Sequence, residues 1–390
     1  MPFHHRHPRF SPRGLTLLEL LLGMTVLSII MITIGATMST MQNTWSRTRS
    51  KADTYRSTRM ALESMGRRIS QATLATRMVQ DEESTGSAGI PPYRPESDLH
   101  FVLGPVQGSN GLQLNNNACG HAIFFQAPFG EPGDPRKNTS APSSSDTESF
   151  NRLTSTLCSW GYFVEYGEDQ AAMPKFLNRD DSRSHRRYRF RLMEFRQPSV
   201  DLGLFKVDEN QKLAYANESP PKLYEWFTEP LRKSHPPVAV VAENVVAVLF
   251  SPFDPAHGSS EVGGSTSVLD TDAPFEITKN GLYDTRRALW NSTPGLSAND
   301  YTWQSLHHLP PGIRMTVIAT SEDSWQRLIA RRGEGEAGSI ARNLMGTINA
   351  RFQRGTPQSF RMDLRNVEQL FTKEGIDYRV FTIDLRMSEQ

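Results

Sequence analysis

The chain has 390 residues, with 43 Lys and Arg against 42 Asp and Glu, and a formal net charge of +1. Nucleic-acid-binding surfaces are usually far more basic, so this balance argues against a nucleic-acid partner. A hydrophobic fraction of 37%, with 27 Gly and 25 Pro, is typical of an exported β-rich domain with long loops.

The first predicted element is a long apolar segment behind a short basic leader. Residues 1–14 contain three arginines and no acidic residue, and the segment that follows carries no formal charge up to Ser46 except at Glu19. A helix needs about 20 apolar residues to cross a bilayer, so we predict a membrane span over about residues 15–38. The cations of the leader predict that it stays in the cytoplasm while the remainder of the chain is exported.

Glu19 is the informative residue of this segment. An ionised carboxylate inside hydrocarbon costs at least about 2.5 kcal/mol, so its presence there predicts a functional partner of opposite charge. Two simpler interpretations stay open. One is a secretory signal peptide, although the apolar run is about twice the 7–15 residues of that class. The other is a signal anchor in which Glu19 has no role.

The stretch Gly14-Leu15-Thr16-Leu17-Leu18-Glu19 resembles the N-terminus of type IV prepilins and pseudopilins, with Leu15 where that family usually has Phe. The resemblance implies that a prepilin peptidase cleaves between Gly14 and Leu15 and methylates the new amino group of Leu15. It also implies that Glu19 pairs with the N-terminal amine of a neighbouring pilin-like subunit.

Helical character continues past the apolar segment and predicts one long helix over residues 15–79. No proline occurs between Arg47 and Val79, and apolar residues recur at intervals of three to four, as on one face of a helix. The opposite face is basic, from Arg47 to Arg77. That face is either simply solvated or in contact with lipid head groups or an acidic partner.

Residues 80–97 are rich in Gly, Ser and Pro and predict a hinge or loop, after which the pattern changes to alternating apolar and polar residues. Residues 98–390 therefore predict an exported, β-rich globular head. The strands expected there are Leu99–Leu103, His121–Gln126, Gly161–Tyr166, Arg187–Phe195, Val238–Phe250, Ile313–Thr320 and Tyr378–Arg386. Helices are expected at Ser324–Arg332 and Leu364–Lys373, and loops at Gly130–Glu148 and Asp254–Thr271. The predicted fold class is α+β, a long pilin-type N-terminal helix packed on an antiparallel-sheet head.

Cys119 and Cys158 are the two cysteines of the chain. In an oxidising compartment they form either one disulfide, closing a loop of about 40 residues and worth about 3–4 kcal/mol, or two buried free thiols. We predict no cofactor and no metal, because no Cys/His cluster with zinc spacing occurs. A weak calcium signal remains at Asp270, Asp272 and Glu276, where a solvated acidic loop is the simpler interpretation.

The sequence contains no nucleophile elbow, phosphate-binding loop, zinc-protease helix or dinucleotide fingerprint, so we predict no enzymatic activity. The seven histidines beyond the leader are scattered, and the adjacent pair His307 and His308 should point apart rather than share a metal.

Several phrases of the head, among them residues 122–128, 158–164, 189–195, 242–248 and 282–286, resemble the Verru_Chthon cassette protein C group of pilin-like proteins. Taken together, the resemblances imply a minor pseudopilin-like subunit at or near the tip of a type IV pilus or type II secretion-like filament. It would be a single-pass inner-membrane protein with a periplasmic head, and its partners would be a prepilin peptidase, other pilin-like subunits and membrane lipid. The alternative is an exported binding or enzymatic domain that uses the span only as an anchor.

Overall fold

The computed structural model describes residues 16–80, 93–108, 111–130, 156–168, 188–205, 222–233, 235–258, 274–276, 281–287, 305–353 and 357–387. By its internal contacts the chain divides into two units, Met1–Ala52 and Asp53–Gln390. The long N-terminal helix α1, Leu17–Ile69, runs through the boundary between them. The predicted span at 15–38 falls in the first unit, and the second unit contains the head.

The helix α1 ends ten residues earlier than the sequence predicts. After Ile69, the amide of Thr73 donates a hydrogen bond to the carbonyl of Gln126 at 3.0 Å, and Ala75 adopts a left-handed conformation with φ +43°. A hydrogen bond to the sheet thus replaces the next helical turn. The residues that follow form strand β1, Arg77–Gln80, so the prediction of helix up to Val79 is wrong.

Strand β1 pairs with β2, Tyr93–Glu96, in an antiparallel two-stranded sheet. The predicted loop over 80–97 therefore contains strand structure at both of its ends. Residues between Gln80 and Tyr93 lie outside the described part of the chain.

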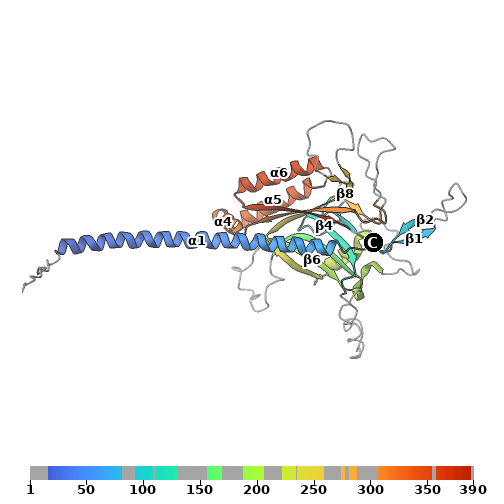
Figure 1. Cartoon of the computed structure of the whole chain (residues 1–390), viewed down its shortest axis with the longest axis horizontal. Coiled ribbons are helices and arrows are strands. Elements are labelled where there is room, and N and C mark those ends of the chain that lie inside the picture. The colour runs from blue at the N-terminus through green and yellow to red at the C-terminus, as the bar shows by residue number, and fades with distance from the viewer. Residues whose placement is uncertain are drawn as a thin grey trace, which may run out of the picture. The chain divides into compact units, whose positions relative to one another are not determined.

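The head is built on one curled sheet. Among the described residues it has ten strands in the path β12-β11-β8-β4-β5-β6-β7, with β3 and β10 paired beside β4 and with β9 paired to β8 (Figure 1). The pairings are antiparallel except for a single parallel bridge between Gly120 of β4 and Val248 of β8. The strands are β3 Val102–Pro105, β4 Ala118–Ala127, β5 Cys158–Glu168, β6 Tyr188–Gln197, β7 Val238–Glu243, β8 Val245–Gly258, β9 Pro274–Glu276, β10 Tyr283–Asp284, β11 Gly312–Thr320 and β12 Tyr378–Arg386.

Each of the seven predicted strands overlaps a strand of this sheet, with boundaries that shift by a few residues. Two corrections concern β8. The segment predicted as one strand, Val238–Phe250, is two, because Asn244 takes a φ of +60° and turns the chain between β7 and β8. Strand β8 also continues to Gly258, into the stretch predicted as a loop from Asp254.

Helices lie against one side of the sheet in Figure 1. They are α4 Glu322–Arg332, α5 Glu334–Arg351 and α6 Pro357–Glu374, while a shorter helix, α3 Glu225–Leu231, follows the 3-10 turn at Lys222–Tyr224. Further 3-10 turns lie at Ser199–Asp201 and Gly203–Phe205. The predicted helices at 324–332 and 364–373 are confirmed within α4 and α6. Helix α5 is anchored to β4 by Asn349, whose side chain bonds the amide of Gly120 at 2.8 Å and the carbonyl of Ala118 at 2.9 Å.

The core of the head is aromatic. Phe124 of β4 stacks on Phe227 of α3 with ring centroids 4.0 Å apart, and it meets Phe195 of β6 edge to face at 5.7 Å. These rings are almost completely buried. The architecture is thus α+β, with a long apolar N-terminal helix and a curled, predominantly antiparallel sheet.

Candidate functional site

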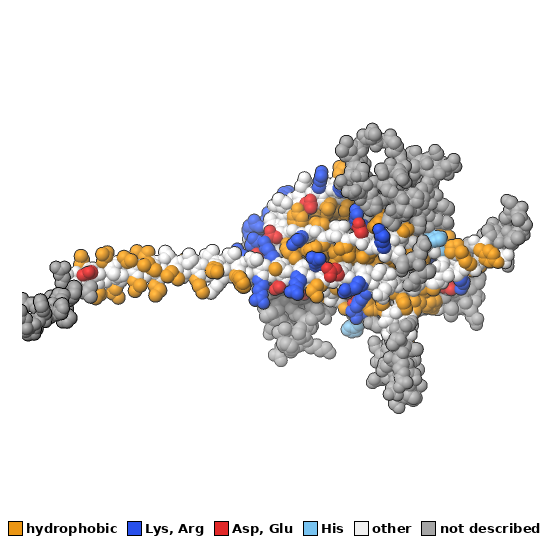
Figure 2. All heavy atoms as spheres, viewed as in Figure 1, with side chains coloured by type: hydrophobic (Ala, Val, Ile, Leu, Met, Phe, Trp, Pro, Cys, Tyr) orange, Lys and Arg blue, Asp and Glu red, His pale blue; other side chains and the backbone are white. Residues whose placement is uncertain are grey.

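The candidate site is the part of helix α1 that lies in the first unit, up to Ala52. This part exposes apolar side chains that a folded domain would normally bury. Leu17 is 79% exposed and Ile32 is 70% exposed, and the most apolar 18-residue window, with a mean hydropathy of 2.4, has no buried residue. The space-filling view shows these side chains all along the helix (Figure 2). Exposed apolar surface of this extent marks an interaction with lipid or with another protein.

Among the described helices, α1 alone is long and apolar enough to cross a membrane, and it lies near the N-terminus. A membrane anchor and a signal sequence both meet that description. The coarse prediction of an N-terminal membrane-competent helix is therefore confirmed.

Glu19 lies in the first turn of α1, where its negative charge is favourable toward the positive end of the helix dipole. Its backbone amide lies 3.3 Å from the hydroxyl oxygen of Thr16, which accepts a hydrogen bond there. Gly14 and Leu15, the predicted cleavage and methylation positions, lie outside the described residues.

The hydroxyl side chains of α1 bond back to their own helix. Thr33 donates to the carbonyl of Ile30 at 2.8 Å, and Thr40 and Thr44 donate to the carbonyls one turn earlier at 2.9 Å. Each hydroxyl is thereby satisfied without water, and the methyl group is left on the surface. This pattern makes a threonine-rich helix compatible with an apolar environment.

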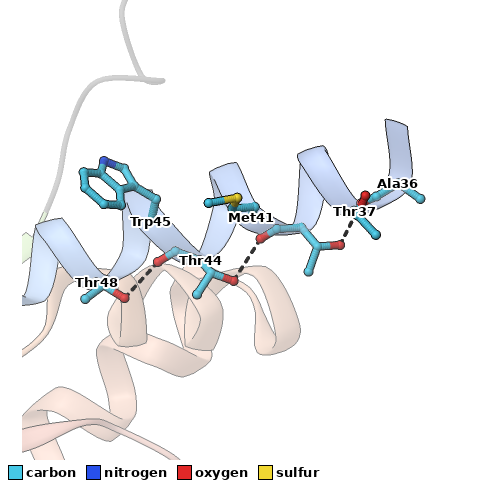
Figure 3. A pocket seen from close by; sticks show the side chains of 7 residues that line it. Ala36, Thr37, Met41, Thr44, Trp45 and Thr48 are labelled. Atoms are coloured by element: carbon cyan, nitrogen blue, oxygen red, sulfur yellow. Dashed lines mark hydrogen bonds between the residues drawn. The ribbon is translucent and has the colours of Figure 1, made fainter. Parts of the chain in front are cut away.

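Toward the C-terminal side of the most apolar 18-residue window, α1 carries a shallow hollow of about 590 Å³ (Figure 3). Figure 3 shows Met41 and Trp45 projecting from the helix, with Thr44 and Thr48 bonded to backbone carbonyls one turn earlier. Its lining residues are Ala36, Thr37, Thr40, Met41, Thr44, Trp45 and Thr48. Since none of them is titratable, the hollow can serve contact through shape and apolar surface but not acid–base chemistry.

The last turns of α1 belong to the head. Thr58, Ala61, Leu62, Met65, Gly66 and Ile69 are buried. At Gly66 a Cβ atom would lie 3.0 Å from Leu385 and 3.2 Å from Ile383, so the helix backbone approaches β12 closely. These buried residues recur at intervals of three to four and form the apolar stripe that the sequence predicts. The surface that it contacts at Gly66 is β12.

A buried carboxylate ties the end of α1 to the sheet. Glu194 on β6 accepts hydrogen bonds from the hydroxyl of Tyr162 at 2.7 Å and from the indole nitrogen of Trp160 at 2.9 Å. It also forms ion pairs with Arg68 of α1 and with Arg196, whose Nε lies 2.6 Å from Oε2. Both guanidinium groups lie near the Trp160 ring, at 4.6 and 5.0 Å from its centroid, within cation–π distance. We call these five residues the Glu194 cluster.

Burial alone would raise the pKa of Glu194, but its hydrogen bonds and the charge of Arg68 outweigh burial, and its pKa lies below the ordinary value. The carboxylate is therefore ionised in the folded head. Sequence reasoning missed this residue. The sequence does carry a signal for it. Side chains two residues apart in a strand lie on the same face, so Glu194 shares its face of β6 with the buried Phe190 and Leu192, where an acidic residue is unusual.

A second buried network holds β10 to α3. His100 Nε2 lies 2.8 Å from Asp284 Oδ1, and the indole of Trp226 donates to His100 Nδ1 at 2.9 Å. Because an indole nitrogen can only donate, Nδ1 is unprotonated and Nε2 carries the hydrogen. Tyr224 donates to the other oxygen of Asp284 at 3.0 Å. The pair is completely buried, so its hydrogen bonds join elements inside the head.

The two cysteines are not bridged. Both are buried free thiols, and the strand register explains why: Cys119 lies opposite Val164, whereas Cys158 lies opposite Ala127. At about 3.3 Å per residue, the eight residues from 119 to 127 separate the two thiols by roughly 25 Å, far beyond disulfide reach. Of the two alternatives, the disulfide is therefore wrong and the free thiols hold.

Within the described part of the chain, no group of three or more His, Cys, Asp or Glu is arranged to hold a metal ion. Asp270 and Asp272 of the calcium hypothesis lie outside that part, and for Glu276, in β9, the backbone alone is described. His307 Nδ1 accepts a hydrogen bond from the amide of Ser97 at 3.2 Å.

Comparisons with protein-family models, with curated proteins and with solved structures found no match for this chain.

Proposed function

We propose that this chain is a minor pseudopilin-like subunit, held in the inner membrane by α1 and assembled from there into or at the tip of a pilus-like filament. The observation that carries the proposal is the division of α1. Its first part exposes an apolar surface with a single carboxylate, and its last turns are integrated into the core of the head.

The apolar part of α1 suits both environments that the proposal requires. In the bilayer its side chains contact lipid, and in a filament the same side chains contact the helices of neighbouring subunits. Because the side chains keep apolar neighbours in both environments, transfer from the bilayer to the filament changes their free energy little. An external motor protein can therefore move the subunit. The satisfied hydroxyl groups support this, because none of them needs water in either place.

Glu19 supplies the register of assembly. Its carboxylate would pair with the amino group that prepilin peptidase creates on Leu15 of an adjacent subunit. Two opposite buried charges are tolerated together, whereas removal of one leaves the other uncompensated at a cost of about 3–5 kcal/mol. A subunit that docks out of register leaves both charges unpaired, which selects one axial position.

The last turns of α1 supply the mechanical connection. A helix that is pulled from a membrane must carry its head with it, and buried contacts from Ala61 to Ile69 resist separation. The Glu194 cluster adds a charged connection at the end of the helix. A large head fits poorly inside a closely packed shaft, which favours a minor or capping position.

The decisive test replaces Glu19 with Ala in the native host and follows both membrane insertion and cross-linking to other pilin-like subunits. We expect insertion to persist and cross-links to fall at least tenfold. Glu63→Ala is the matched control, because Glu63 is an acid of the same helix that lies on the exposed surface and pairs with Arg59. Its cross-links should be unchanged.

Equal cross-linking by Glu19→Ala and the parent chain would favour the other function, an exported domain that uses α1 only as an anchor. Mass spectrometry of the mature N-terminus gives an independent answer. A chain that begins at N-methylated Leu15 supports the proposal, whereas cleavage near Ala36 would make the protein a soluble secreted domain and overturn it.

A further inference from the structure

The two borders of the head's sheet differ in how well they are protected against a further strand. Strand β7, at one border, has six residues, and its register against β6 shifts between Val240 and Ala242, as at a β-bulge. Strand β12, at the other border, has nine residues, all paired with β11 in one unbroken register. Short strands and bulges protect sheet edges, whereas a long, regular edge is a template for pairing. The border at β12 lacks both of these protections.

Hydrogen bonds at the two ends of β12 show which of its backbone groups face away from β11. The amide of Met387 donates to the carbonyl of Pro311 at 2.9 Å, and the amide of Ser321 donates to the carbonyl of Asp377 at 3.0 Å. Both pairs continue the register of β11 and β12 by one position. Because residues of an antiparallel pair alternate between bonding the partner strand and pointing away from it, the odd residues of β12 bond β11. The outward N–H and C=O groups belong to the even residues, Tyr378, Val380, Thr382, Asp384 and Arg386.

Within the described part of the chain, no hydrogen bond reaches these outward backbone groups, and β12 pairs with no strand other than β11. Thr382 and Asp384 are exposed, and the centre of the strand, from Val380 to Ile383, carries no charge and no proline. A row of donors and acceptors at strand spacing is satisfied along its length only by another extended backbone. The edge of β12 is therefore suited to bind a strand.

The side chains of β12 indicate which residues such a strand should carry toward α1. On that face Phe381, Ile383 and Leu385 are half-buried. The ring of Tyr55 lies 6.2 Å from that of Phe381, and a Cβ atom at Gly66 would contact the other two side chains. Neighbouring side chains on one face of a sheet pack together, so apolar residues at alternate positions would extend this row.

The charges near the ends of β12 indicate the rest. Arg379 and Arg386 are exposed and seven residues apart, and neither forms an ion pair with another described residue. Asp384, in contrast, is neutralised by Arg314 at 2.7 Å. Opposite charges on adjacent strands are stabilising, which favours a partner with two acidic residues at the same spacing.

We propose that the open edge of β12 binds an extended segment of a partner protein, which adds to the sheet as an antiparallel strand. The segment carries apolar residues toward α1 and acidic residues opposite Arg379 and Arg386. Backbone hydrogen bonds give affinity in this mode of recognition, and the alternating side chains give specificity. The proposal needs only the fold of the head, so it goes beyond the proposed function and can fail while that function stands.

Hydrogen exchange of the full chain in detergent tests the edge itself, with single amides resolved by mass spectrometry. We expect the outward amides of Val380, Thr382 and Asp384 to exchange at least about tenfold faster than the inward amides of Phe381 and Ile383. Equal protection of the two sets would mean that the edge is already covered in the free chain, and would overturn the proposal.

The binding probe is a synthetic peptide, Glu-Val-Thr-Ile-Thr-Val-Thr-Glu-Thr, whose two glutamates lie opposite Arg386 and Arg379 when it runs antiparallel to β12. We expect it to slow the exchange of the outward amides only. A second peptide, N-methylated at its third, fifth and seventh residues, keeps every side chain but lacks the N–H groups that would face β12. It should bind at least about tenfold more weakly. Equal binding of the two peptides, or no binding of the first, would overturn the proposal.

Variants of the chain test the same contact from the other side. Thr382→Pro removes an outward N–H at the centre of the edge and leaves the bonds to β11 in place, so the first peptide should bind about tenfold or more weakly. Thr382→Val keeps that N–H and loses only the hydroxyl, which lies 3.3 Å from that of Thr316, so it should bind the peptide as the parent chain does.

Val240→Pro is the matched control at the other border. The amide of Arg196 donates to the carbonyl of Pro237 at 2.9 Å, and the register from there makes the amide of Val240 face away from β6. Peptide binding should be unchanged in this variant. Unchanged binding by Thr382→Pro, or an equal loss in all three variants, would overturn the proposal. If Thr382→Pro does not fold, the N-methylated peptide decides the question on the parent chain.

Discussion

Along α1, the residues from Leu17 to Ala52 and those from Asp53 to Ile69 share one helical geometry but have opposite surroundings. The first stretch exposes Leu, Ile, Val and Met side chains on every side. The second is polar on one side and buries a narrow apolar stripe, including Leu62, Met65 and Ile69. Among the described residues, the large apolar side chains from Leu17 to Trp45 are thus exposed, whereas those of the stripe in the second stretch are buried.

This difference separates two reasons for apolar residues in a helix. A stripe at intervals of three to four residues is complementary to a folded surface on one side, whereas apolar residues all round need a medium or several neighbours. The second stretch packs on the head, and we propose that lipid or other subunits surround the first.

The largest effect should come from cutting the chain on either side of the buried stripe. A fragment that begins at Asp53 keeps the stripe and should fold as a soluble head without detergent. A fragment that begins at Ser70 loses Leu62, Met65 and Ile69, each worth about 2–5 kcal/mol, and so loses most of a typical stability of about 5–15 kcal/mol. Circular dichroism and size-exclusion chromatography distinguish the two outcomes. Cooperative unfolding of the shorter fragment would show that the stripe is not part of the core.

Single substitutions test the same comparison at finer scale. Met65→Ala should lower the free energy of unfolding of the head by about 2–5 kcal/mol, because Met65 is completely buried. Leu27→Ala is the matched change in the first stretch, where Leu27 is 57% exposed, and the unfolding of the head should not respond to it. Urea denaturation in detergent measures both. A similar loss for the two variants would contradict the division of α1.

The Glu194 cluster gives a smaller effect. Glu194→Gln keeps the size of the side chain but removes the charge that faces Arg68 and Arg196. A fully buried pair would lose about 3–5 kcal/mol, and partial exposure of both arginines reduces our expectation to about 2–3 kcal/mol. Asp384→Asn, which breaks the more exposed pair with Arg314, should cost less than about 1 kcal/mol. Equal losses would mean that burial of Glu194 adds nothing to its ion pairs.

Much of the fold could be predicted from local pattern, because side chains along β12 alternate between the more buried and the more exposed face of the sheet. In β6 the alternation of polar and apolar residues predicted the strand but not its burial, since both of its faces are covered. What the sequence could not supply was pairing. The separation of Cys119 and Cys158 depends on the register of β4 against β5, which no local pattern encodes. The end of α1 depends on the hydrogen bond from Thr73 to Gln126, a residue more than fifty positions away.

Helix α5 shows another limit. Its three glycines, Gly335, Gly338 and Gly346, lower helix propensity by about 1 kcal/mol each relative to alanine, and its sequence has no strong amphipathic pattern. Packing on the sheet and the hydrogen bonds of Asn349 stabilise it instead. The long apolar N-terminal helix, in contrast, was predictable because its length and apolar composition are local properties of the sequence, independent of any tertiary contact.

The smallest predicted effect is a pH dependence of the free energy of unfolding of the head, to which the first stretch of α1 should not contribute. Burial lowers the pKa of His100, and the attraction of Asp284 only partly opposes it. Below the ordinary value of 6.5 the unfolded chain therefore binds a proton that the folded chain resists, so stability falls as the pH decreases from 6.5 toward the folded pKa. Unfolding free energies between pH 7 and pH 5 measure the slope. Trp226→Phe removes the donor that occupies Nδ1, so His100 can then take up a proton beside Asp284, and the slope should decrease even though the variant is less stable overall. An unchanged slope in Trp226→Phe would mean that burial, and not the tautomer imposed by the indole, keeps His100 neutral.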